Sequence, residues 1–136
     1  MLKTLSLLAL AFAASGAAAQ TATYKVDGDG IAKPLTGTPG NAARGKALLA
    51  ARSAAPCLDC HVITDKGLPK GGDKGPSLDG VGAVLTTPQL RLSVADYANV
   101  AKGKEMPVFH KSGASDPRLS AQEVEDVVAY LATLKK

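Results

Sequence analysis

Large aromatic side chains are scarce in this chain. Its 136 residues include no Trp, three Tyr and two Phe, and one of the two, Phe12, lies near the amino terminus. A domain of this size ordinarily fills its centre with large apolar bodies. The length allows a single domain, and a core filled by a large apolar body other than a side chain would tolerate this shortage.

Long apolar runs are also missing. The run over residues 5–14, after Lys3, is shorter than the roughly 17–25 residues that a spanning helix needs. Small residues at 17–19 then match the cleavage site of a secretory signal. The sequence predicts that residues 1–19 are a removed signal peptide, that the mature protein is periplasmic, and that no segment spans a membrane. A membrane anchor is the alternative that the short run disfavours.

Charge of either sign is modest. Sixteen Lys and Arg against twelve Asp and Glu give a net charge of +4, and Lys3 leaves with the signal. A strongly basic surface, which nucleic-acid binding requires, is not indicated. No nucleic-acid partner is therefore expected.

The chain has only two cysteines, and both lie in the segment Cys57 to His61. Two cysteines separated by two residues and followed at once by a histidine form the attachment pattern for a c-type haem. Cys57 and Cys60 would bond the porphyrin as thioethers, and His61 would reach the iron as an axial ligand. The pattern predicts one covalently attached haem c, which would also supply the missing apolar body.

The two cysteines have three alternative uses. A redox dithiol of thioredoxin type is disfavoured because no βαβ pattern surrounds the pair. A zinc site built from Cys57, Cys60, His61 and His110 would need adjacent side chains to ligate one tetrahedral ion, which is sterically awkward. A structural disulfide across the same turn is the third alternative.

A haem iron held by His61 has a second axial position. Met106 becomes the only methionine once Met1 leaves with the signal, and Pro107 biases it toward an extended conformation on a loop. A thioether favours reduced iron and raises the reduction potential. Met106 is the predicted ligand, with His110, Lys104, an open position, or a core-filling role for Met106 as alternatives.

Pro76 follows the haem motif in a glycine-rich loop. A ligating histidine is normally oriented by a hydrogen bond from its second ring nitrogen. The Pro76 carbonyl is a candidate acceptor for His61, and an ordinary turn is the equal alternative.

The remaining chain predicts an all-α domain over residues 41–136, preceded by an extended arm over residues 20–40. The arm has no helical period, and we expect it to be flexible or ordered only against a partner. A first helix should begin at the N-cap Asn41 and a last helix at the capping box of Ser120. Between them, short helices should begin at Thr87 and again at Ser93.

With these motifs in place, the chain resembles the class I cytochromes c over residues 41–136. The resemblance rests on Gly45 in the first helix, Cys57 to His61, the Gly75 to Leu78 loop, Met106-Pro107 and residues 128–131. It implies that the first and last helices cross at Gly45, close to Tyr130 or Leu131. It also implies that the Pro76 carbonyl receives the ring proton of His61.

A narrower resemblance is to the SoxX family, the small monohaem subunits of SoxAX cytochromes. It rests on residues 75–82, 90–92 and 105–109 taken in that order. It implies a heterodimer with a larger haem-containing SoxA-type subunit that acts as a thiosulfate-oxidising L-cysteine S-thiosulfotransferase on a SoxYZ-type carrier. This chain would pass electrons to a downstream cytochrome c and would hold no catalytic residue. The alternative is a free, diffusible periplasmic electron carrier.

Overall fold

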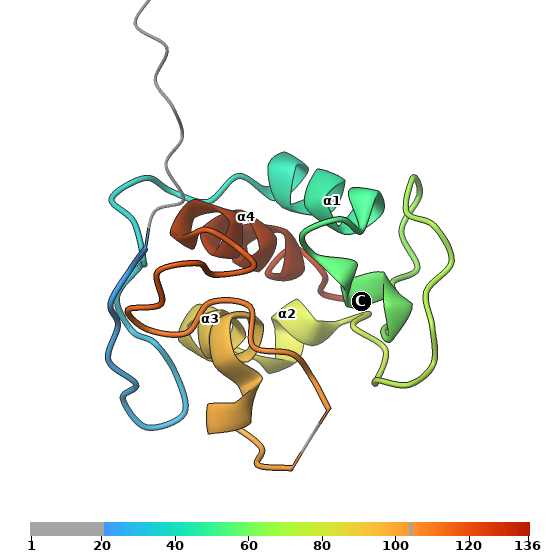
Figure 1. Cartoon of the computed structure of the whole chain (residues 1–136). Helices are drawn as coiled ribbons and strands as arrows, with labels where there is room; N and C mark the ends of the chain where they lie inside the picture. The colour runs from blue at the N-terminus through green and yellow to red at the C-terminus, as the bar shows by residue number, and fades with distance from the viewer. Residues whose placement is uncertain (1–20, 104) are drawn as a thin grey trace, which may run out of the picture.

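Helices joined by long loops make up the structure, a computed structural model that describes residues 21–103 and 105–136. The expected signal peptide lies outside the described residues. The helices are α1 (Ala42–Ala51), η1 (Pro56–Asp59), α2 (Val81–Val84), α3 (Thr87–Asp96), η2 (Tyr97–Asn99) and α4 (Ala121–Leu131). The described ranges contain no β-strand beyond an isolated bridge between Asp27 and Gly30. The predicted all-α class is confirmed (Figure 1).

Helices α1 and α4 lie side by side (Figure 1), and their backbones come close together at Gly45. A Cβ atom on Gly45 would strike the carbonyl oxygen of Asp126 and would lie 3.0 Å from the Tyr130 Cβ. Only a glycine therefore lets the two backbones meet. The close approach that the family resemblance implied at this position is confirmed.

The first and last helices of the domain, α1 and α4, begin where the capping patterns predict. Asn41 accepts a hydrogen bond from the Arg44 N–H at the start of α1. Ser120 and Glu123 form a reciprocal capping box at the start of α4. The apolar stripe of α4 is buried, namely Val124, Val127, Val128 and Leu131. Helical periodicity in the sequence predicts that this stripe continues to Leu134, which lies beyond the helix end and still packs on the core.

The segment around α3 differs from the prediction of two short helices. It is a single helix that begins with a capping box of Thr86 and Gln89, and Ser93 lies inside it. The expected second start at Ser93 is wrong because Leu92 and Val94, on either side of it, are buried and carry the helix onward. Helix α2 begins at Val81, within residues 62–82, for which the density of glycine and proline predicts a loop.

The arm is extended, as predicted, but it packs against this chain rather than awaiting a partner. Ile31 is only 1% exposed and its N–H donates to the Pro88 carbonyl at 3.0 Å. The Leu35 N–H donates to a Glu125 carboxylate oxygen at 2.7 Å. The apolar side chain of Ile31 thus completes the core, a role that glycine and proline content alone conceals.

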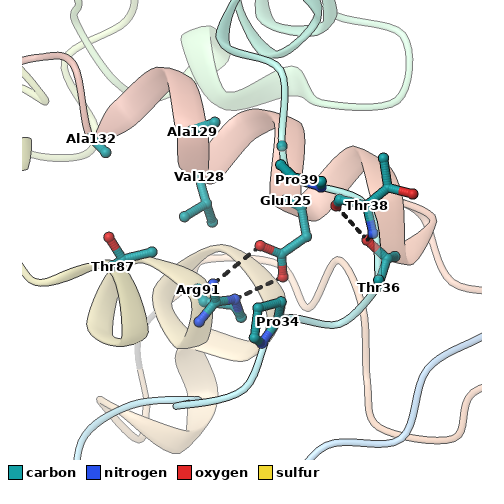
Figure 2. Close-up of a pocket in the computed structure, with 12 residues that line it drawn as sticks. Pro34, Thr36, Thr38, Pro39, Thr87, Arg91, Glu125, Val128, Ala129 and Ala132 are labelled. Carbon is teal, nitrogen blue, oxygen red and sulfur yellow. Dashed lines mark hydrogen bonds and ion pairs between the residues drawn. The ribbon is translucent and has the colours of Figure 1, made fainter.

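A buried ion pair lies beneath the arm (Figure 2). Arg91 of α3 and Glu125 of α4 are joined by two hydrogen bonds of 2.7 and 3.1 Å. Their side chains are 5% and 6% exposed. The remaining donors of Arg91 reach the Ile31 carbonyl at 2.6 Å, so the pair ties the arm to both helices. An adjoining cavity of about 340 Å³ is lined by residues of the arm, α3 and α4, and by none of the residues from Cys57 to His61.

No helix within the described ranges combines the length and the apolar character that crossing a bilayer requires.

Candidate haem site

The segment from Cys57 to His61 folds as a tight turn. Pro56 starts the short helix η1, and the N–H groups of Cys60 and His61 both donate to the Cys57 carbonyl, at 3.2 and 2.9 Å. Neither cysteine forms a disulfide, and both are half-buried. Two thiols and an imidazole are therefore held together within one turn of backbone.

The imidazole of His61 is oriented by the Pro76 carbonyl. Its Nδ1 lies 2.7 Å from that oxygen. Because a carbonyl oxygen only accepts hydrogen bonds, Nδ1 carries a proton, and in the neutral ring Nε2 keeps its lone pair. This is the tautomer that a metal-ligating histidine needs. The hydrogen bond implied by the family resemblance is present, and the loop at Pro76 is more than an ordinary turn.

Glycines of the loop after His61 pack directly on the motif, a role the sequence analysis did not find. A Cβ atom on Gly71 would strike the His61 carbonyl oxygen, and one on Gly72 would strike that of Asp59. A Cβ atom on Gly75 would lie 2.5 Å from Cε1 and 2.7 Å from Nδ1 of His61. The N–H of Gly75 also donates to the Cys60 carbonyl at 2.8 Å. The glycine density of this loop was the available signal.

Arg52 braces the same loop from the end of α1. It adopts a left-handed conformation with φ of 57°. Its guanidinium donates to the Asp59 carboxylate at 3.2 Å and to the Lys70 carbonyl at 2.6 Å. The side chain therefore connects the haem motif to the loop that folds back over it.

Two carboxylates secure the loop further along. Asp79 accepts a hydrogen bond from the Thr64 N–H at 2.7 Å, which lowers the pKa of Asp79. Asp65 accepts from Lys46 at 2.9 Å and from the Tyr130 hydroxyl at 2.8 Å, and these bonds lower the pKa of Asp65. Burial, followed by the bond to Asp65, raises the pKa of Tyr130. The loop is thereby joined to α1 and α4.

Met106 lies on the loop between η2 and α4. Its side chain is half-buried and packs against the hydrophobic core. Cys57 packs against the same core. The structure therefore brings the predicted second ligand and the attachment motif onto one apolar cluster, although they are distant in sequence.

His110, the main alternative ligand, is already engaged through both ring nitrogens. The residue is fully buried. Its Nδ1 donates to the Leu119 carbonyl at 2.7 Å, and its Nε2 accepts from the Ala22 N–H at 3.3 Å. These bonds leave no lone pair for a metal. Lys104, the other named alternative, lies outside the described residues.

The alternative uses of the cysteines find no support in the described part of the chain. Burial raises the pKa of the Cys57 thiol to about 11, whereas a redox dithiol needs a lowered value to form thiolate. Residues 21–103 and 105–136 contain no group of three or more His, Cys, Asp or Glu side chains placed to hold a metal ion. Cys57, Cys60, His61 and His110, the residues of the alternative zinc site, are therefore not placed to ligate one ion together.

The donor set fits a c-type haem. Two thiols are available and half-buried, one imidazole nitrogen keeps its lone pair, and a thioether packs on the same core. Sulfur and imidazole donors of this kind are those that hold haem covalently and axially.

Comparison with known families agrees with the site. The family model of cytochrome c matches residues 42–135, and the chain belongs to this family. It is a class I cytochrome c similar to SoxX. With its one pair of cysteines it carries one covalently attached haem c and serves electron transfer.

Solved structures give the finer likeness. A chain in the crystal structure of SoxXA from P. pantotrophus is 34% identical, with 79% of this chain and 91% of that chain covered and a TM-score of 0.73. The c-type cytochrome SorU from Sinorhizobium meliloti is 24% identical over 68% and 88% of the two chains, with a TM-score of 0.48. Ferric cytochrome c-550 from Paracoccus versutus is 22% identical over 71% and 99%, with a TM-score of 0.46. The last two TM-scores are too low to bear on function. No curated protein matches the chain.

Proposed function

We propose that this chain is the haem c electron-transfer subunit of a periplasmic thiosulfate-oxidising enzyme of the SoxAX type. Cys57 and Cys60 would hold the haem through two thioether bonds. His61 and Met106 would ligate its iron, and the Pro76 carbonyl orients His61. Residues 1–19 are the signal peptide that is removed on export, and residues 41–136 form the cytochrome domain against which the arm packs.

The 2.7 Å hydrogen bond between His61 Nδ1 and the Pro76 carbonyl carries the assignment of the site. It leaves Nε2 available on a histidine next to Cys60, and the ring lies so close to Gly75 that a side chain at that position would strike it. When bound, haem supplies a one-electron carrier. The residues of this chain hold it, fix the ring of His61, and offer a thioether that favours the reduced state.

Sulfur chemistry belongs to another subunit in this proposal. Both cysteines are used in attachment, so the chain keeps no thiol nucleophile. The likeness to a chain of SoxXA supports a heterodimer with a SoxA-type subunit. That heterodimer would act as an L-cysteine S-thiosulfotransferase on a SoxYZ-type carrier, and this chain would pass the released electrons to a downstream cytochrome c.

Isolation from the native host tests this assignment. We expect the chain to co-purify with a larger haem-containing subunit. Thiosulfate added together with the carrier protein should reduce the haem of this chain, as followed by its visible absorption bands, and thiosulfate without the carrier is the control. Recovery as a lone monomer whose haem stays oxidised under both conditions would favour a free, diffusible carrier instead.

A further inference from the structure

The loop that holds Met106 is fixed to the rest of the protein by hydrogen bonds around His110. The Ala95 carbonyl at the end of α3 accepts the N–H groups of Phe109 and His110, at 3.0 and 2.9 Å. The Leu119 N–H donates to the Phe109 carbonyl at 2.9 Å, and His110 Nδ1 donates to the Leu119 carbonyl. The segment from Phe109 to Leu119 is thus closed on itself and fixed to α3.

The arm completes this support from the other side. The Ala22 N–H donates to His110 Nε2, and the Tyr24 hydroxyl donates to the His110 carbonyl at 3.0 Å. The Tyr24 N–H donates to Ser112 Oγ at 2.9 Å, and that hydroxyl donates back to the Tyr24 carbonyl at 3.1 Å. The Gly113 N–H donates to the Ala22 carbonyl at 3.1 Å. Two residues of the arm, Ala22 and Tyr24, therefore share five hydrogen bonds with the loop.

These bonds satisfy polar atoms that burial would otherwise penalise. His110 is fully buried, and the arm supplies the partners of its ring Nε2 and of its main-chain carbonyl. A buried polar atom that loses its partner destabilises the conformation that buries it. Withdrawal of the arm would consequently favour rearrangement of the loop only a few residues beyond Met106.

We infer that Tyr24 and His110 are positioning residues for Met106: the arm acts through His110 to hold the loop in the conformation that presents the thioether to the haem iron. The inference rests on the proposed role of Met106 as an axial ligand. A thioether is a neutral ligand on a loop, so ligation competes with loop opening, and any contact present only in the closed loop adds to the apparent strength of the bond.

Imidazole competes with the Met106 thioether for the iron, so its apparent affinity measures how readily the Met106 loop opens. The full-length holoprotein, with its partner subunit if one co-purifies, is titrated with imidazole in the oxidised state while the far-red sulfur-to-iron absorption band is followed. Tyr24→Phe removes one hydroxyl and keeps the ring. We expect it to raise the apparent affinity for imidazole about five-fold, the effect of losing one ordinary hydrogen bond from the closed loop. Ser112→Ala should shift the affinity in the same direction.

Tyr130→Phe is the matched control. It removes a hydroxyl that bonds to Asp65, in the loop after His61 rather than the loop of Met106. We expect this variant to lower the free energy of unfolding while leaving imidazole affinity at the wild-type value. A general loss of stability would instead move both tyrosine variants together, and that result would contradict the inference.

Met106→Ala supplies the reference for a loop without its ligand. If the wild-type protein lacks the band and binds imidazole as Met106→Ala does, then ligation by Met106 is wrong and the inference falls with it. If the wild type has the band but Tyr24→Phe and Ser112→Ala both bind imidazole as the wild type does, only the inference is overturned.

Discussion

The loop after His61 and the loop that holds Met106 are supported in different ways. The first is held mainly by residues close to it in sequence: His61 bonds to Pro76 and Thr64 to Asp79, each fifteen residues apart. The second is held from afar, because Tyr24 and Ser112 are 88 residues apart. One side of the candidate haem site is built by local backbone geometry, and the other by an arm from the opposite end of the chain.

The two candidate ligands, His61 and Met106, therefore depend on different parts of the fold. The ring of His61 is fixed mainly by one glycine-rich segment that folds back on the attachment motif, as Gly71 and Gly75 allow, and the Tyr130 hydroxyl adds one distant bond to that loop at Asp65. The Met106 side requires α3, the segment to Leu119 and the arm to be assembled together. Loss of tertiary structure should therefore release the methionine side before the histidine side.

Removing the ion pair that ties the arm to α3 and α4 should have the largest effect on the free energy of unfolding. Glu125→Gln removes the only charge that pairs with Arg91 within the described contacts, and both side chains are almost fully buried. We expect the free energy of unfolding to fall by about 3–5 kcal/mol, because a buried guanidinium is left without its anion. Chemical denaturation of the holoprotein measures this loss.

A double-variant cycle with Arg91→Met separates the ion pair from the other contacts of Glu125. The double variant should lose clearly less than the two single losses combined, since removing both charges avoids an unpaired buried one. Additivity to within about 0.5 kcal/mol would show that the pair is not coupled.

A side chain added to the glycine-rich loop after His61 should have an intermediate effect on the free energy of unfolding. Gly71→Ala places a Cβ atom against the His61 carbonyl oxygen, which is backbone and can move only with the motif. We expect a loss of about 2 kcal/mol in the free energy of unfolding, as for other overpacked sites. Gly37→Ala is the control, because a Cβ atom there meets nothing within 4 Å. Equal losses in the two variants would contradict the close approach.

Lowering the pH should have the smallest effect on stability, and we expect part of that effect to come from Asp79 in the loop after His61. Hydrogen bonds lower the pKa of Asp79, principally the one from the Thr64 N–H, so its ionised form is the one that stabilises the fold. That stabilisation is present above the carboxyl pKa of the unfolded chain, near pH 4, and is lost as the pH falls through the lower folded value. Denaturation midpoints measured from pH 5 to pH 2 should fall less steeply in Asp79→Asn.

Asp73→Asn, at an exposed carboxylate of the same loop, is the control for the acid experiment. It should keep the wild-type acid dependence. If Asp73→Asn and Asp79→Asn reduce the fall of the denaturation midpoint with pH equally, the bond of Asp79 to Thr64 does not cause the acid dependence.

Local patterns predicted much of the fold. The caps at Asn41 and Ser120 and the apolar stripe of α4 are confirmed, since each depends on residues within a few positions of one another. The start expected at Ser93 is wrong because burial of its neighbours outweighed a plausible cap. Local propensity is a weak prior where tertiary packing opposes it.

The contacts that escaped prediction are those between distant segments. The ion pair of Arg91 with Glu125 and the bonds of Tyr24 to the His110 segment join residues with no shared pattern in the sequence. Neither charge nor spacing indicates that two such side chains meet. Ile31, in a stretch of glycine and proline, likewise gave no sign that it belongs to the core.

By itself the sequence determined the attachment motif from Cys57 to His61, the candidate ligand Met106, and the helices that begin and end the domain. These follow from adjacent residues and from helical periodicity. Only the tertiary structure decided that His110 is used up in hydrogen bonds, that glycines press on the His61 backbone, and that the arm belongs to the fold. The physical reason is that hydrogen-bond partners and steric contacts depend on distances between segments, which the order of residues does not specify.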